Sequence, residues 1–218
     1  PGGGDTPQEA TRPEEFGELS QVACSVLMKL LYAARVARWD LLRAIGMLAR
    51  LVTKWSKHCD KALHRLMCYV HSSTEVTMIN HVGQSDTLDE IELNVYADAD
   101  LAGERPTYKS TAGYIGQLWG PNTMFNFAAK SKTIGGVCNS TPEAEMSSAN
   151  MALKQIGFPT LDLLEVVCER KVVLRWYEDN TATIQIVTTG RNPTMRHLSR
   201  HQGISVRFLH DTFFPRDE

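Results

Sequence analysis

The stretch that most constrains the fold runs from residue 91 to residue 103, IELNVYADADLAG. Apolar and polar residues alternate through its first half, which is the period-two pattern of a β-strand with one buried face. Asp98 lies on the polar face at the end of the strand expected over 91–98, and Asp100 follows in the expected loop. Two acids at the end of a strand indicate a place where a divalent metal could bind.

Helical spacing of apolar residues precedes this strand. Between residues 19 and 71 it predicts three helices joined by short turns, with Ser56 as the cap of the third. The first eighteen residues are rich in Gly, Pro and acidic residues, a composition typical of a flexible tail. We therefore expect a tail over 1–18, a small all-helical subdomain over 19–72 and a linker over 73–90.

From residue 91 the chain changes to an α/β pattern. The pattern predicts four strands, over 91–98, 109–119, 123–129 and 172–177. A helix is expected to start near Pro142, with Ser140 and Glu143 forming a capping box. The sequence Gly157-Phe158-Pro159 is expected to break this helix, and 181–187 is expected to be helical.

Three acids lie in comparable places in this pattern. Asp98 ends the first strand, Asp179 follows the fourth, and Glu145 lies in the first turns of the helix between them. If the first and fourth strands are parallel neighbours, the three carboxylates converge at one end of the sheet. Carboxylates so close raise one another's pKa, and divalent cations remove that conflict. Two Mg²⁺ ions about 3.5 to 4 Å apart could then promote an in-line displacement at a phosphodiester.

Basic residues gather in the expected helical subdomain. The acids Asp40 and Asp60 are outnumbered there by Lys29, Arg35, Arg38, Arg43, Arg50, Lys54, Lys57, Lys61 and Arg65. Such a surface could contact the phosphates of a nucleic acid, or it could be an ordinary solvated face of the helices. Arg50, Lys54 and Lys61 are our candidate nucleic-acid contacts.

A series of short motifs adds to this interpretation. In chain order they are YADADLAG (96–103), KSTAGY (109–114), KSKT (130–133), STPEAE (140–145) and YEDN (177–180). Their order and spacing resemble the ribonuclease H domain of copia-type retrotransposon Pol polyproteins. LMKLLYAA (27–34) and ALHRL (62–66) resemble the segment that connects reverse transcriptase to ribonuclease H in the same polyproteins.

The resemblance implies a ribonuclease-H-like α/β fold over 91–218, with a mixed sheet and flanking helices. It implies cleavage of the RNA strand of an RNA–DNA hybrid with two Mg²⁺ ions, for which Mn²⁺ could substitute. Asp98, Glu145 and Asp179 match the first three metal-binding catalytic carboxylates of the family. Asp100 matches a residue of the motif that is not a core ligand, so we expect a supporting role for it.

The family pattern continues beyond the residues that this chain offers. The stretch 196–211 resembles the helix before the last strand of the family, but that strand and its alanine-aspartate pair have no counterpart before Glu218. Asp211 and Asp217 lie in no matching motif, so we expect the fourth carboxylate to be absent. This chain alone should then cleave weakly or not at all. The alternative hypothesis is a catalytically inactive remnant that acts as a nucleic-acid-binding or structural module.

Composition indicates the cellular compartment and the kinds of partner to expect. Its five cysteines are scattered and form no C-x-x-C pair, as is typical of reduced intracellular thiols. No apolar run approaches the length of a membrane span, so no membrane partner is expected. The predicted location is a cytoplasmic particle or the nucleus. Besides a hybrid, the resemblance implies the reverse transcriptase and integrase parts of the polyprotein as partners.

Overall fold

A computed structural model of the chain describes residues 16–104, 107–192, 195 and 197–214. Contacts between Cα atoms divide the chain into a helical unit, Pro1–Ala33 with Ala44–Val76, and an α/β unit, Ala34–Arg43 with Thr77–Glu218. Among the helices of the described residues, none combines the length and the apolar character needed to cross a membrane.

The helical unit is built on three α-helices, as the apolar spacing predicts. They are α1 (Ser20–Val36), α2 (Leu42–Ala49) and α3 (Lys57–Ser72), with short 3-10 turns at Trp39–Leu41 and Val52–Lys54. Trp55 is 2% exposed, and its indole N–H donates to the Asp60 carboxylate at 2.7 Å. The same carboxylate accepts from the backbone N–H groups of Glu18 and Leu19, which fixes the start of α1 against α3. Of the predicted tail, only Phe16 to Glu18 lie among the described residues.

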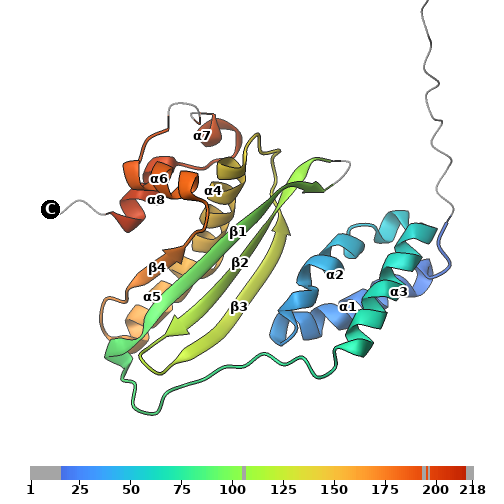
Figure 1. Cartoon of the computed structure of the whole chain (residues 1–218), viewed down its shortest axis with the longest axis horizontal. Helices are drawn as coiled ribbons and strands as arrows, with labels where there is room; N and C mark the ends of the chain where they lie inside the picture. Colours follow the sequence, from blue (N-terminus) through green and yellow to red (C-terminus); the bar gives the residue numbers. More distant parts are fainter. Residues whose placement is uncertain (1–15, 105–106, 193–194, 196, 215–218) are drawn as a thin grey trace, which may run out of the picture. The chain divides into compact units, whose positions relative to one another are not determined.

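The α/β unit contains a four-stranded mixed sheet, drawn in green to orange in Figure 1. Its strands are β1 (Glu92–Glu104), β2 (Lys109–Trp119), β3 (Met124–Thr133) and β4 (Leu174–Tyr177), in the order β3-β2-β1-β4. The first three strands form an antiparallel meander, and β4 runs parallel to β1. The predicted fold class, a mixed sheet with flanking helices preceded by a helical subdomain, is confirmed.

The prediction that the first strand ends at Asp98 is wrong. β1 continues to Glu104, so Asp100 lies in the strand and not in a loop. The physical reason is the length of β2, which offers Gly113 opposite Asp98 and Thr111 opposite Asp100 before the register becomes irregular. Asp98 is therefore an interior residue of a long strand, and the strand that ends near it is β4.

The predicted helix break at Gly157-Phe158-Pro159 is also wrong. α4 (Thr141–Ala152) passes through a π-helical segment, Leu153–Gly157, directly into α5 (Phe158–Cys168). Proline lacks a backbone N–H and its ring crowds the preceding turn of an α-helix. The wider π turn before Pro159 relieves both problems, so the helix continues.

Among the described residues, three short α-helices follow β4. The helix predicted over 181–187 is present as α6 (Thr181–Thr189). The single helix expected over 196–211 is instead two among the described residues, α7 (Leu198–His201) and α8 (Val206–Phe213). Gly203 adopts a φ of 65° between them, and Ser205 caps α8 by accepting from the Phe208 N–H at 3.1 Å. A glycine in the left-handed region ends a helix, and that explains the division.

Small residues let α4 lie close to the sheet, behind which α4 and α5 pack in Figure 1. Ala144, Ala149 and Ala152 of α4 are fully buried against Leu93 and Val95 of β1. On its other side, α4 packs against α6, α7 and α8 through a second cluster made of Met146, Leu153, Val187, Leu198, Ile204 and Leu209. Because α4 is held between two cores, its side chains have defined positions relative to β1.

The segment from residue 77 to residue 90 runs along the start of β3. His81 forms an antiparallel bridge with Met124, and the Asn126 N–H donates to the Asn80 Oδ1 at 2.9 Å. A 3-10 turn, Leu88–Glu90, with a capping box then leads into β1. These contacts cover part of an outer sheet edge that would otherwise offer unpaired backbone groups.

Candidate metal centre

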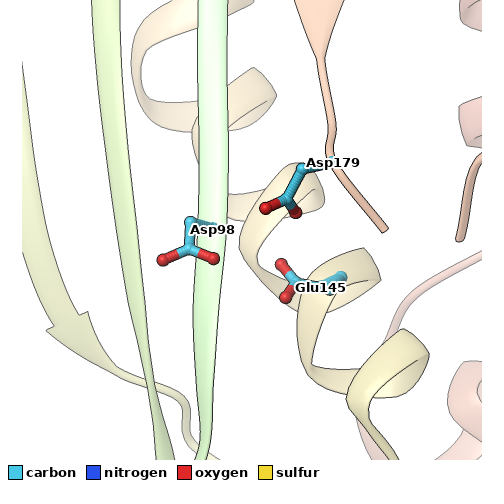
Figure 2. Close-up of side chains that lie close together, drawn as sticks. All are labelled: Asp98, Glu145 and Asp179. Atoms are coloured by element: carbon cyan, nitrogen blue, oxygen red, sulfur yellow. The ribbon is translucent and has the colours of Figure 1, made fainter. Parts of the chain in front are cut away.

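Three carboxylates converge in the α/β unit, as Figure 2 shows. Asp98 comes from β1, Glu145 from the second turn of α4, and Asp179 from the loop after β4. One carboxylate oxygen from each residue lies within 4.8 Å of the others. The structure thus brings together the three site residues that the sequence suggests, and their role as metal ligands stays a prediction.

β1, which contains Asp98, and β4, which precedes Asp179, separate just before the site. β4 pairs with β1 only from Leu174 to Tyr177, and the last pair is Tyr96 opposite Tyr177. The two tyrosine rings stack with their centroids 4.6 Å apart and an interplanar angle of 11°. Asp98 and Asp179 each follow a stacked tyrosine by two residues. The aspartates therefore lie on both sides of the fork where β1 and β4 separate.

Arginine side chains hold β4 beside β1. The Arg170 guanidinium donates to the carbonyl oxygens of Leu88 and Ile91 at 2.7 and 2.8 Å. Arg175 forms a two-point ion pair with Glu92, at 2.5 and 2.8 Å, and this hydrogen-bonded partner lowers the pKa of Glu92. These contacts fix the start of the parallel pair and, through it, the position of the fork.

The position of Glu145 is set by how α4 is fastened at the sheet. Ser148, one turn further along α4, is fully buried, and its hydroxyl donates to the Asp98 carbonyl oxygen at 2.8 Å. The same hydroxyl lies 3.3 Å from the Gly113 carbonyl oxygen on β2. Glu145 is thereby held opposite Asp98, and the two carboxylates lie close together.

The N-terminus of α4 is fastened differently from the predicted capping box. Ser140 makes no side-chain cap hydrogen bond. The buried Glu143 carboxylate instead accepts from the Asn139 N–H at 2.8 Å and from the Gln202 amide at 2.5 Å. The capping-box prediction is therefore wrong, because Gln202 reaches Glu143 from beyond α7. This contact ties α4 to the C-terminal helices.

Glu145 carries the strongest electrostatic effect at the site. It is 3% exposed, and its Oε2 has no hydrogen-bond partner among the described residues. Burial, followed by the charges of Glu178, Asp98 and Asp179, raises its pKa to about 8, and the Ala99 N–H opposes part of the rise. A buried carboxylate with a free oxygen, facing other carboxylates, is an environment that a cation would stabilise.

Glu178 is the residue that the sequence interpretation missed. It is half-buried, and burial raises its pKa to about 7, with the Asn180 N–H opposing the rise and Asp179 and Asp98 adding to it. A signal was present in the sequence. Leu174 and Trp176 alternate toward the core, so the parity of β4 places Glu178 on the same inner side.

The remaining candidate residues lie apart from this group. Asp100 is exposed and forms an ion pair with Arg43, consistent with a role other than ligand. Asp211 pairs with Arg207 within α8 at 3.2 Å, and Asp217 lies outside the described residues. The three candidate nucleic-acid contacts, all exposed side chains of the helical unit, are Arg50, Lys54 and Lys61.

The donor set fits hard divalent cations. Every candidate ligand is a carboxylate oxygen, which Mg²⁺, Mn²⁺ and Ca²⁺ prefer over nitrogen or sulfur. The exposed Asp98 and Asp179 leave one side of the group open to solvent, and the buried Glu145 closes the other. An ion bound there would keep some of its own waters, as Mg²⁺ usually does.

Comparison with known proteins shows similarity to a Pol polyprotein. The chain is 26% identical over 199 residues to the retrovirus-related Pol polyprotein from transposon TNT 1-94 of Nicotiana tabacum. The match covers 91% of this chain and 14% of that polyprotein. No protein-family model matches the chain, and no solved structure matches it significantly. The similarity supports an origin of the chain in a retrotransposon Pol polyprotein.

Proposed function

We propose that this chain is a retrotransposon-derived ribonuclease H domain, which hydrolyses the RNA strand of an RNA–DNA hybrid by two-metal-ion catalysis in its parent polyprotein. The observation that carries the proposal is the convergence of Asp98, Glu145 and Asp179 within 4.8 Å across the fork between β1 and β4. The similarity to a retrovirus-related Pol polyprotein from a transposon supports the same proposal.

The proposed chemistry assigns separate tasks to the three acids. Asp98 and Asp179 are exposed and would hold divalent metal on the solvent side, whereas the buried Glu145 would hold it from within. When bound, Mg²⁺ would supply an activated water and stabilisation of the leaving oxygen. The fixed backbone around Ser148 keeps Glu145 in place, so little reorganisation is needed when substrate arrives.

Recognition of a hybrid would rest on its backbone and not on its bases. A ribonucleic strand is read through its shape, its phosphates and its 2′-hydroxyl groups. The stacked Tyr96 and Tyr177 lie beside the acids, and Tyr177 is 42% exposed. An exposed aromatic ring next to a metal centre is suited to contact a sugar or an unstacked base. We also propose that the reverse transcriptase and integrase parts of a polyprotein are partners, in a cytoplasmic particle or the nucleus.

The direct test is cleavage of a hybrid whose RNA strand is labelled. With Mg²⁺ or Mn²⁺, we expect the purified protein to shorten the RNA strand slowly and leave the DNA strand intact. Asp98→Asn should lower the rate by at least about 100-fold, because a ligand of a metal site acts as part of a unit. The measurement is the initial rate of product formation on a denaturing gel.

Asp100→Asn is the matched control, since it makes the same chemical change two residues along β1. We expect it to retain most of the rate, because Asp100 lies outside the carboxylate group. Equal residual cleavage in wild type and Asp98→Asn would show contamination. Metal binding without any cleavage would contradict hydrolysis by this chain and support the inactive remnant.

The helical unit provides a second prediction. Replacing Arg50, Lys54 and Lys61 together with Gln should weaken hybrid binding and flatten its dependence on salt. Each lost phosphate contact should reduce the slope of log K against log salt by about one. The measurement is fluorescence anisotropy of a labelled hybrid from low to moderate salt concentration.

A triple variant with the same change in charge controls for net charge. It replaces three exposed basic residues of the α/β unit, namely Lys171, Arg191 and Arg207. We expect this variant to keep the wild-type slope. If both triple variants reduce the slope equally, the effect comes from net charge, and the helical unit makes no specific contact.

A further inference from the structure

Glu178 occupies a position where the fold otherwise places apolar residues. Tyr96 and Tyr177 form the last pair of β1 and β4, and the next residues along the two chains are Ala97 and Glu178. Ala97 is 7% exposed and belongs to the core between the sheet and α4. Glu178 therefore carries a carboxylate toward the inner side of the fork, where Glu145 also lies.

The hydrogen bonds of Glu178 satisfy only half of its carboxylate. Its Oε1 accepts from the Asn180 N–H at 3.0 Å, which fixes the side chain. Its Oε2 is buried and has no hydrogen-bond partner among the described residues, which is also true of the Glu145 Oε2. An uncompensated buried carboxylate oxygen is costly, so two of them near one site make an environment that a hydrogen-bond donor or a cation would stabilise.

Glu178 also borders the same hollow as the aspartates. Asp98, Glu178 and Asp179 all line one open depression of the α/β unit. Glu178 is not part of the tight carboxylate group, which Asp98, Glu145 and Asp179 form. A carboxylate that lines the same depression without being a ligand could act through a water that a bound metal holds, since outer carboxylates commonly orient what the metal holds.

We propose that Glu178 is a fourth acidic residue of the metal centre, which strengthens divalent metal binding through the water on the inner side of the site. This inference rests on the proposed function, because it requires metal at Asp98, Glu145 and Asp179. Glu178 is a positioning residue in this scheme: its Oε2 would be the acceptor for water that a bound metal holds, while its Oε1 stays on the Asn180 N–H.

The test is Mn²⁺ binding by the full chain, measured by isothermal titration calorimetry at pH 7. Glu178→Gln keeps the size of the side chain and an oxygen for the Asn180 N–H, but it removes the charge. We expect the Mn²⁺ dissociation constant to rise about tenfold or more, as is typical when an outer partner of a ligand is lost. Thermal unfolding in chelator should show the metal-free variant at least as stable as wild type, because a buried like charge is gone.

Glu169→Gln, at an exposed glutamate after α5, is the control and should bind Mn²⁺ as wild type does. If Glu178→Gln lowers metal-free stability and leaves the dissociation constant unchanged, Glu178 is merely structural and the inference is overturned. Mn²⁺ binding that Asp98→Asn abolishes and Glu178→Gln leaves intact overturns this inference alone. Absence of Mn²⁺ binding by wild type overturns both this inference and the proposed function.

Discussion

The metal-free protein should lose stability as the pH rises from about 5 to about 8, and Glu145→Gln should remove a large part of that loss, with the raised pKa of Glu178 accounting for the rest. The pKa of Glu145 rises from 4.5 to about 8 in the folded protein. Between these values the unfolded chain releases its proton and the folded protein keeps it. Because the folded state then binds more protons, its stability falls with rising pH until the folded carboxyl also ionises.

The size of this effect follows from the shift. One pKa unit corresponds to about 1.4 kcal/mol. Because the cluster of three carboxylates is open to solvent on the side of the two aspartates, solvent screens part of the effect, and we expect a loss of about 2 kcal/mol in the free energy of unfolding. The measurement is chemical denaturation in chelator at a series of pH values. Addition of Mg²⁺ at pH 8 should restore the stability of wild type and not that of Glu145→Gln. If both proteins show the same pH dependence, Glu145 does not cause it.

Ser148→Leu should be among the most damaging single substitutions in the α/β unit. Ser148 is fully buried at the contact between α4 and the sheet, and its hydroxyl donates to the Asp98 carbonyl oxygen. A leucine would force α4 away from β1 and leave that contact unmade. We expect a loss of about 3 kcal/mol in the free energy of unfolding. Mn²⁺ should bind at least about tenfold more weakly, because Glu145 moves with the helix.

Ser148→Ala separates the two causes. It removes the hydroxyl and adds no volume, so we expect a loss of only about 1 kcal/mol and nearly unchanged Mn²⁺ affinity. Thermal unfolding and calorimetric titration of both variants provide the comparison. A Ser148→Leu protein with wild-type melting temperature and metal affinity would show that α4 does not need close contact at this point.

The strands were predictable because the alternation of apolar and polar residues in the sequence matches which side chains are buried in the sheet. Leu93, Val95 and Ala97 are buried, as their alternation predicts, and a mixed sheet results. The end of β1 was not predictable in the same way, since it depends on the length of a partner strand. From the sequence alone, Asp98 is typical of the end of a strand. Because β2 provides residues that pair with Asp98 and Asp100, the strand continues past both.

The continuous helix through Pro159 shows a different limit. A proline two residues after a glycine, as in Gly157-Phe158-Pro159, favours the end of a helix. The sequence around these residues shows no pattern that indicates a π turn. Burial of Leu153 and Ile156 in the π-helical segment before Pro159 keeps the chain helical. Tertiary packing therefore overrides the local signal, and no periodicity in a single sequence reports it.

The carboxylate group was predictable in its members and not in its full surroundings. The polar face of the first strand, the start of the helix and the end of the fourth strand identify Asp98, Glu145 and Asp179, although the first strand continues past Asp98. The parallel pairing of β1 and β4 was a condition of that prediction, and the structure fulfils it. Glu178 was overlooked because it lies beside a stronger candidate, although its position in the alternation of β4 indicated an inward direction.

The short pairing of β1 with β4 has a mechanical consequence. Only four residue pairs join the two strands, from Leu93 with Leu174 to Tyr96 with Tyr177. A ladder this short opens first at the end where the chains separate, and so its last amides should exchange with solvent sooner than those of β1 and β2. An ion that joined Asp98 to Asp179 would fasten that end. Metal binding would then slow the hydrogen exchange of the β4 amides, because it would keep this edge strand paired with β1.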